Sequence, residues 1–171
     1  MSRFPLLPFL LLLSLLAACE QAPRQLRAVE AVAQLRPLEG RAAQGTIEFR
    51  QRGDGVALAG EMTGLRGRTH VYRLHQFGDC SDPRGRSAGP EQRFRSALSE
   101  AVVPGTMLET SSDETGEVSL VGTMEAAMLS GAQSIIGRSV VVHRVERSER
   151  GDRSETRVAC GVIGIVREEL R

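Results

Sequence analysis

The chain has 171 residues, of which 41% are hydrophobic, and its formal net charge is +1. This length fits one domain of ordinary size with its own core, and the nearly balanced charge excludes the basic footprint of a nucleic-acid-binding protein. Aromatic residues make up only 4% of the chain and tryptophan is absent. The core is therefore expected to consist mainly of aliphatic side chains.

Residues 1–18 have the pattern of an export signal. Arg3 gives a positive start, an apolar run follows, and the run ends in the lipobox LAAC at Cys19. The apolar run is too short for a comfortable transmembrane helix. We predict a lipoprotein signal peptide over 1–18 and a lipidated Cys19 that attaches the protein to a membrane, with Glu20 favouring the outer membrane facing the periplasm. The alternative is an ordinary secretory signal followed by an incidental cysteine.

Residues 19–44 are predicted to form the lipidated N-terminus and a tether to the folded domain. This segment is rich in Ala, Arg, Gln and Glu, and its apolar positions allow a short amphipathic helix over 29–35 that is too short to be stable alone. The folded domain is predicted to cover 45–171. Removal of the signal would also take away Arg3, one of 22 cationic residues, and so balance the 21 acids.

From residue 45 onward the hydrophobic period is two, which is typical of β-strands. Residues 45–50 and 56–63 alternate apolar and polar side chains around a Gly/Asp turn at 52–55, which predicts a hairpin. Val71 and the run 140–142 mark further strands, and turn chemistry follows at 113–116 and 149–151. Short strands at this spacing indicate an all-β sandwich or barrel. The irregular segments 76–95 and 147–156 are where a site is expected.

Three segments resemble the Cu/Zn superoxide dismutases. They are HVYRLHQFGDC at 70–80, SIIGRSVVVH at 134–143 and RVACGVIGI at 157–165, and they occur in the order of the family. The resemblance covers about residues 45–166 and implies an eight-stranded Greek-key barrel. It also places Cys80 and Cys160 in the two cysteine contexts of the family. Since Cys19 is expected to carry lipid, a Cys80–Cys160 disulfide is predicted in an oxidising compartment.

The resemblance implies a copper held by four histidines and a neighbouring zinc that shares one of them, but the sequence contains only three histidines. His75 and His143 match two copper ligands. Arg73, which cannot donate a lone pair, stands at a third ligand position, and Glu91 stands where the shared histidine is expected. The two remaining histidines could hold Cu(I). The alternative is that both are inert and hydrogen-bonded in place, with Glu91 pairing to Arg73.

No zinc site is expected, because residues 91–109 contain no histidine or cysteine and Thr106 falls nearest the family's aspartate. His70 matches a family histidine with a structural role, hydrogen-bonded to backbone across the barrel loops. Arg157 matches the arginine that guides superoxide to copper, and the alternative role is a salt bridge to an acid.

Three functions remain open at this point. The first is an exported lipoprotein with a superoxide dismutase-like domain that has lost the zinc site and half of the copper ligands. Such a protein has little or no dismutase activity and serves binding or structure. The second is residual copper-dependent dismutation, and the third is a periplasmic Cu(I)-binding protein, both through His75 and His143. No nucleic-acid partner is expected, the sequence names no protein partner, and a homodimer is left open.

Overall fold

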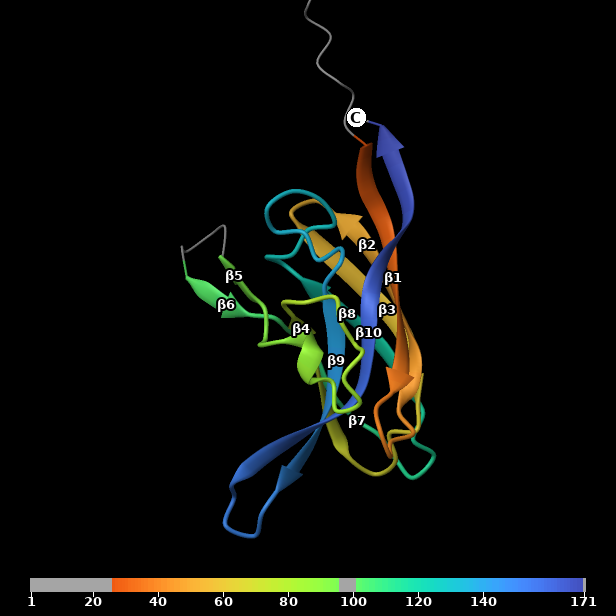
Figure 1. Ribbon diagram of the computed structural model, residues 1–171, viewed down its shortest axis with the longest axis vertical. Helices are drawn as coiled ribbons and strands as arrows, with labels where there is room; N and C mark the ends of the chain where they lie inside the picture. Colours follow the sequence, from red (N-terminus) through yellow and green to blue (C-terminus); the bar gives the residue numbers. More distant parts are fainter. Residues whose placement is uncertain (1–25, 96–100, 171) are drawn as a thin grey trace, which may run out of the picture.

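The computed structural model describes residues 26–95 and 101–170, and in this part the regular structure is almost entirely β-strand (Figure 1). The expected all-β class is confirmed. The strands are β1 (Leu26–Pro37), β2 (Gln44–Arg52), β3 (Gly55–Thr63), β4 (Thr69–His75), β5 (Arg93–Arg95), β6 (Val102–Pro104), β7 (Thr106–Ser111), β8 (Val118–Met124), β9 (Ser139–Arg147) and β10 (Arg153–Leu170), with one 3-10 turn, η1 (Arg86–Ala88).

Eight strands form one antiparallel sheet in the order β7-β4-β9-β10-β1-β2-β3-β8. The two ends of this order, β7 and β8, have Cα atoms within 8 Å of each other, so the sheet curls into a nearly closed barrel. After β4 and its neighbour β7, the chain crosses to β8, which pairs with β3 at the other end of the strand order. It then returns to β9, which pairs with β4. This crossing is the predicted Greek-key arrangement. β5 and β6 pair separately and project beside the barrel (Figure 1).

The predicted hairpin is present as β2 and β3, joined by a tight turn at Gly53 and Asp54. Gly53 has a φ of +53°, which a side chain would disfavour. Within β2 the alternation places Ile47 and Phe49 in the core and Glu48, between them, outside. The strands expected around Val71 and at 140–142 are also confirmed, as β4 and β9. The period of two therefore determines which side chains face the interior.

The N-terminal segment differs from the expectation of a tether. Residues 26–37 form β1, which pairs with β10 on one side and β2 on the other. The short helix that the sequence allowed over 29–35 does not form, because burial there has period two: Ala31, Ala33 and Leu35 lie in the core and Gln34 is exposed. The folded domain therefore begins well before residue 45.

The physical reason is that β1 lies between two strands that hydrogen-bond to both of its edges. Alanine favours a helix in isolation, but a short helix here would leave β2 and β10 with unpaired edges. The small side chains also suit a close approach, since a Cβ on Gly161 of β10 would lie only 2.4 Å from the Gln34 carbonyl oxygen of β1. Tertiary pairing thus overrides local propensity.

This placement predicts the pattern of limited proteolysis by trypsin, which cuts after arginine. We expect no cleavage after Arg27 or Arg36 in the native protein, because both lie within β1 in the sheet. Cleavage is expected first after Arg147 or Arg150, which are exposed at the tip of the β9–β10 hairpin. Mass spectrometry of early fragments checks this. Early cuts after Arg36 with the remainder folded would restore the tether interpretation.

The predicted signal peptide and the lipidation at Cys19 lie outside the described residues. Among the residues that the structure describes, no helix has the length and apolar character needed to cross a membrane.

Candidate metal centre

The two candidate copper ligands, His75 and His143, lie on the outer face of β4 and β9 together with Arg73. In β4, alternation sends His70, Tyr72 and Leu74 into the interior, whereas Arg73 lies on the opposite face with His75. His143 on β9 and Arg157 on β10 are cross-strand partners and share that face. The loop of residues 76–92 folds back over it and brings Glu91 opposite His75. Strand register therefore gathers residues from distant parts of the sequence.

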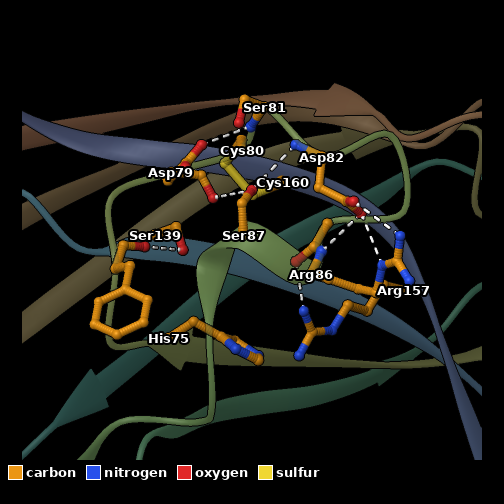
Figure 2. The surroundings of a disulfide bond; sticks show 12 residues. His75, Asp79, Cys80, Ser81, Asp82, Arg86, Ser87, Ser139, Arg157 and Cys160 are labelled. Atoms are coloured by element: carbon orange, nitrogen blue, oxygen red, sulfur yellow. Dashed lines mark hydrogen bonds and ion pairs between the residues drawn. A yellow bond between two sulfur atoms is a disulfide. The ribbon is translucent and has the colours of Figure 1, made fainter.

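The covering loop is held by the predicted disulfide. Cys80 is bonded to Cys160 of β10, which is buried beside Leu38, Ala88 and Val141 (Figure 2). Within the loop, the Asp82 carboxylate accepts hydrogen bonds from the backbone amides of residues 84 and 86. These contacts fix the path that leads from Cys80 through η1 to Gly89.

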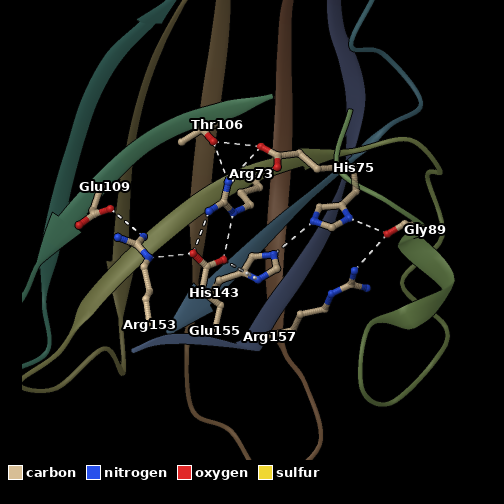
Figure 3. A network of polar contacts seen from close by, with 10 residues as sticks. Arg73, His75, Gly89, Thr106, Glu109, His143, Arg153, Glu155 and Arg157 are labelled. Carbon is tan, nitrogen blue, oxygen red and sulfur yellow. Dashed lines mark hydrogen bonds and ion pairs between the residues drawn. The ribbon is translucent and has the colours of Figure 1, made fainter. Parts of the chain in front are cut away.

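His75 and His143 face each other beneath this loop. Their Nε2 atoms are 3.2 Å apart, and both side chains are buried. His75 Nδ1 lies 2.8 Å from the Gly89 carbonyl oxygen, which can only accept, so Nδ1 carries the proton (Figure 3). The Nε2 lone pair of His75 therefore points at His143, whose Nε2–H can donate to it in the metal-free protein.

Burial lowers the pKa of both imidazoles. For His143, burial and then the neighbouring His75 lower the pKa to about 4. For His75, burial again dominates, and the Gly89 hydrogen bond opposes it only in part. Both rings are therefore neutral at pH 7, which is the state that a metal ligand or a hydrogen-bonded structural pair requires.

Arg73 forms an ion-pair network beside the histidines. Its Nε and Nη2 donate to the two Glu155 oxygens at 3.2 and 2.8 Å, while Nη1 contacts Glu91 Oε1 at 3.1 Å and Thr106 Oγ1 at 2.8 Å (Figure 3). Thr106 in turn donates to Glu91 at 2.9 Å. The side chain of Arg73 is only 19% exposed, so these contacts are partly shielded from water. The Arg73–Glu91 pairing considered from the sequence is present.

Glu155 is the residue of the Arg73 network that the sequence analysis did not identify. It contacts Arg73, receives a hydrogen bond from Arg153 at 3.1 Å and lies 3.7 Å from His143 Nδ1. Burial raises its pKa, but the hydrogen bond and charge of Arg73 outweigh burial and hold the pKa below its usual value. The available signal was period two in β10, since residues 153, 155 and 157 share one face.

Arg157 and His70 have local roles in the structure. Arg157 donates to the carbonyl oxygens of Gly85 and, at 3.1 Å, Gly89, and so supports the covering loop. It forms no salt bridge within the described residues. His70 lies on the core side of β4 with Nδ1 at 3.2 Å from the Arg68 carbonyl oxygen, two residues away along the chain. That contact is local and does not cross the barrel loops.

The donor set does not fit zinc. A structural zinc ion is bound by four protein ligands, usually imidazole or thiolate groups. The described residues contain no group of three or more His, Cys, Asp or Glu side chains that could hold a metal ion. Residues 96–100, part of the segment expected to lack a zinc site, lie outside the described residues.

Copper fits only in part. Two imidazoles suit Cu(I), which tolerates few ligands, but they do not supply the ligands that Cu(II) prefers. With imidazole–metal distances of about 2.0 Å, as in zinc sites, a linear site would need the two nitrogens roughly 4 Å apart. The Nε2 separation of 3.2 Å would therefore have to open slightly. His75 and His143 would therefore suit one soft cation only after this separation opens.

The lowered pKa of His143 predicts a loss of stability in mild acid. Because its folded pKa of about 4 lies below the ordinary 6.5, the unfolded chain binds more protons between these values. Above about pH 6.5 the free energy of unfolding of the metal-free protein should have its full value. It should fall towards pH 4, with about 3 kcal/mol due to His143.

Urea unfolding at about pH 7 and about pH 4.5 measures this change, with His143→Gln as the comparison. The variant should lose less stability between the two pH values than the parent. An identical loss in both proteins would assign the acid sensitivity to other groups.

Comparisons with known proteins give two matches. The model of a family described as copper/zinc superoxide dismutase matches residues 43–163. The chain is 33% identical over 139 residues to an extracellular superoxide dismutase [Cu-Zn] of Caenorhabditis elegans, a match that covers 74% of this chain. The match spans 63% of that relative's length.

Proposed function

Because the chain belongs to the copper/zinc superoxide dismutase family, we propose that it is an exported member that has lost the zinc site and half of the copper ligands. It does not dismute superoxide at a significant rate and has a binding or structural role in the cell envelope. The observation that carries this proposal is the Arg73 network, in which the two residues that the resemblance assigns to ligand positions, Arg73 and Glu91, are paired with each other.

The network opposes copper chemistry in two ways. A guanidinium has no lone pair to give, and it stays charged at any pH of interest, so it repels a metal cation nearby. Its hydrogen bonds to Glu91 and Glu155 also hold those carboxylates away from a metal. Removing a single member would leave a partly buried charge without its partner, which is destabilising. The ion pairs therefore replace the metal cluster as the link between β4, β10 and the covering loop.

A second candidate function, holding Cu(I) without turnover, is favoured by the environment of the two histidines. The outward nitrogen of His75 faces a carbonyl oxygen and that of His143 faces the Glu155 carboxylate. If the His143 proton moves to Nδ1, both Nε2 lone pairs face each other. Such outer hydrogen-bond partners orient imidazoles for metal binding. This arrangement would leave the pair able to hold one soft cation.

Export and anchoring complete the proposal. The signal pattern over 1–18 and the lipobox at Cys19 support a lipid anchor, with the domain facing the periplasm from the outer membrane. The extracellular location named for the Caenorhabditis elegans relative agrees with export. A homodimer is compatible with this proposal and is not needed by it.

Copper loading and a superoxide assay test the proposal. The parent and a His75→Gln, His143→Gln variant would be loaded with equal copper, dialysed against a mild chelator and analysed for metal and for superoxide decay. We expect equal, negligible decay in both proteins and no retained zinc. Copper retained only by the parent would identify the Cu(I)-holding function. A parental rate near the diffusional ceiling, about 10⁹ M⁻¹s⁻¹, would contradict the loss of dismutation.

A further inference from the structure

A pocket lined by arginines lies at the end of the barrel where β1 and β3 end and β4 begins. The ends of these strands are in the lower part of Figure 1. Its volume is about 350 Å³. The walls come from the β1–β2 loop, the β3–β4 turn and strands β4, β9 and β10. The lining includes Arg41, Arg66, Arg68, Arg144 and His70, and no acidic residue.

Most of the positive charge of this pocket is not held in ion pairs, although the Glu114 carboxylate lies close to Gly67, between Arg66 and Arg68. Arg41, Arg66 and Arg68 form no salt bridge with any acid in the described ranges 26–95 and 101–170. Arg144 pairs with Glu146 at 2.6 Å, but Glu146 is 49% exposed, so that pair is a weak competitor for an incoming anion. Burial, and then the charge of Arg144, lower the pKa of His70, so the charge at pH 7 comes from the four guanidinium groups.

Arg144 also presents an unused donor. Its Nε is buried and has no hydrogen-bond acceptor among the described residues. A buried donor without an acceptor is costly and usually has a structural or ligand-related explanation. Arg144 lines the pocket, and the edge of its guanidinium that carries Nε also carries Nη2, which contacts Glu146, so an incoming oxyanion would compete with Glu146 for this edge. That edge matches the spacing of two oxygens on one oxyanion.

The pocket walls are held in place by backbone contacts. Gly64, with a φ of +75°, packs so closely that a Cβ there would lie 2.2 Å from the Ala42 carbonyl oxygen of the facing loop. The β3–β4 turn is tied to the β7–β8 connection, because the Gly67 amide donates to the Asp113 carbonyl oxygen at 2.8 Å. The arginines therefore project from a fixed frame, which lowers the entropic cost of binding an anion.

We propose that this pocket binds a phosphate-type oxyanion, as free phosphate or as the phosphate group of a small ester. Guanidinium groups bind phosphate by paired, charge-assisted hydrogen bonds. A volume of about 350 Å³ lies within the range of roughly 300–1,000 Å³ that is usual for ligand pockets, so a phosphate with a small organic carrier fits. The site is separate from the His75 and His143 pair, since His70 and Arg144 lie on the core side of β4 and β9.

Isothermal titration of the full protein with inorganic phosphate, and separately with glycerol phosphate, tests the proposal. One saturable site is expected with at least one probe, and the tighter probe identifies the free ion or the ester as the ligand. Arg66→Ser with Arg68→Ser should weaken binding at least about tenfold. Arg41→Ser, from the opposite wall, should weaken it as well, and it keeps the test valid if the double variant does not fold.

The matched control is Arg147→Ser with Arg150→Ser, which removes the same charge from the exposed tip of the β9–β10 hairpin. Its affinity should stay within about twofold of the parent. No saturable binding of either probe would overturn the proposal. Equal weakening in the control and the pocket variants would also overturn it, since it would show only a general effect of net charge.

Discussion

Replacing Arg73 and Glu91 together by histidine should create Cu(II) binding and raise the rate of superoxide decay by at least about 100-fold over the parent. The two side chains contact each other and lie beside the His75 and His143 pair. The variant would therefore bring four imidazoles together, as copper that changes oxidation state requires. Glu155 would keep Arg153 as its ion-pair partner at 3.1 Å.

Two readouts decide this prediction. Electron paramagnetic resonance should show nitrogen-coordinated Cu(II) in the double variant and not in the parent, and superoxide decay should be faster at equal copper loading. The control is Arg50→His with Glu30→His, which breaks an ion pair of 3.4 Å between β2 and β1 with the same substitutions. An equal gain in the control would mean that any added histidines suffice.

Removing the disulfide by Cys80→Ala with Cys160→Ala should lower the free energy of unfolding by about 4.5 kcal/mol, according to the loop-entropy model. The two cysteines are separated by 80 residues, so the bond closes a long loop in the unfolded chain. The bond also anchors the segment leading to Gly89, which accepts hydrogen bonds from His75 and Arg157. Its loss should therefore loosen the histidine pair as well.

Urea unfolding of the parent and the variant measures the loss of stability. Cys19→Ser serves as the control, because it removes the third cysteine and should leave the stability of the barrel unchanged. A loss below about 1 kcal/mol in the Cys80→Ala, Cys160→Ala variant would show that the loop-entropy model does not apply here.

Much of the candidate site could be predicted from sequence, because the resemblance supplies positions and the residue types supply chemistry. Arg73 and Glu91 stand at ligand positions, and their opposite charges predict the ion pair that the structure shows. The part played by Glu155 could not be predicted in the same way. It reaches Arg73 only because β10 and β4 both flank β9, an arrangement that no local pattern encodes.

The sequence by itself determined the all-β class and the β2–β3 hairpin, because alternation and turn residues act over short distances. It also determined the Cys80–Cys160 pairing, because the two cysteines stand in the contexts of the family. Only the tertiary structure decided that residues 26–37 form a strand. Their alanine-rich composition allows helix or coil, and the hydrogen bonds that select a strand come from β2 and β10. The arginine pocket likewise exists only after folding, when loops far apart in the sequence meet at one end of the barrel.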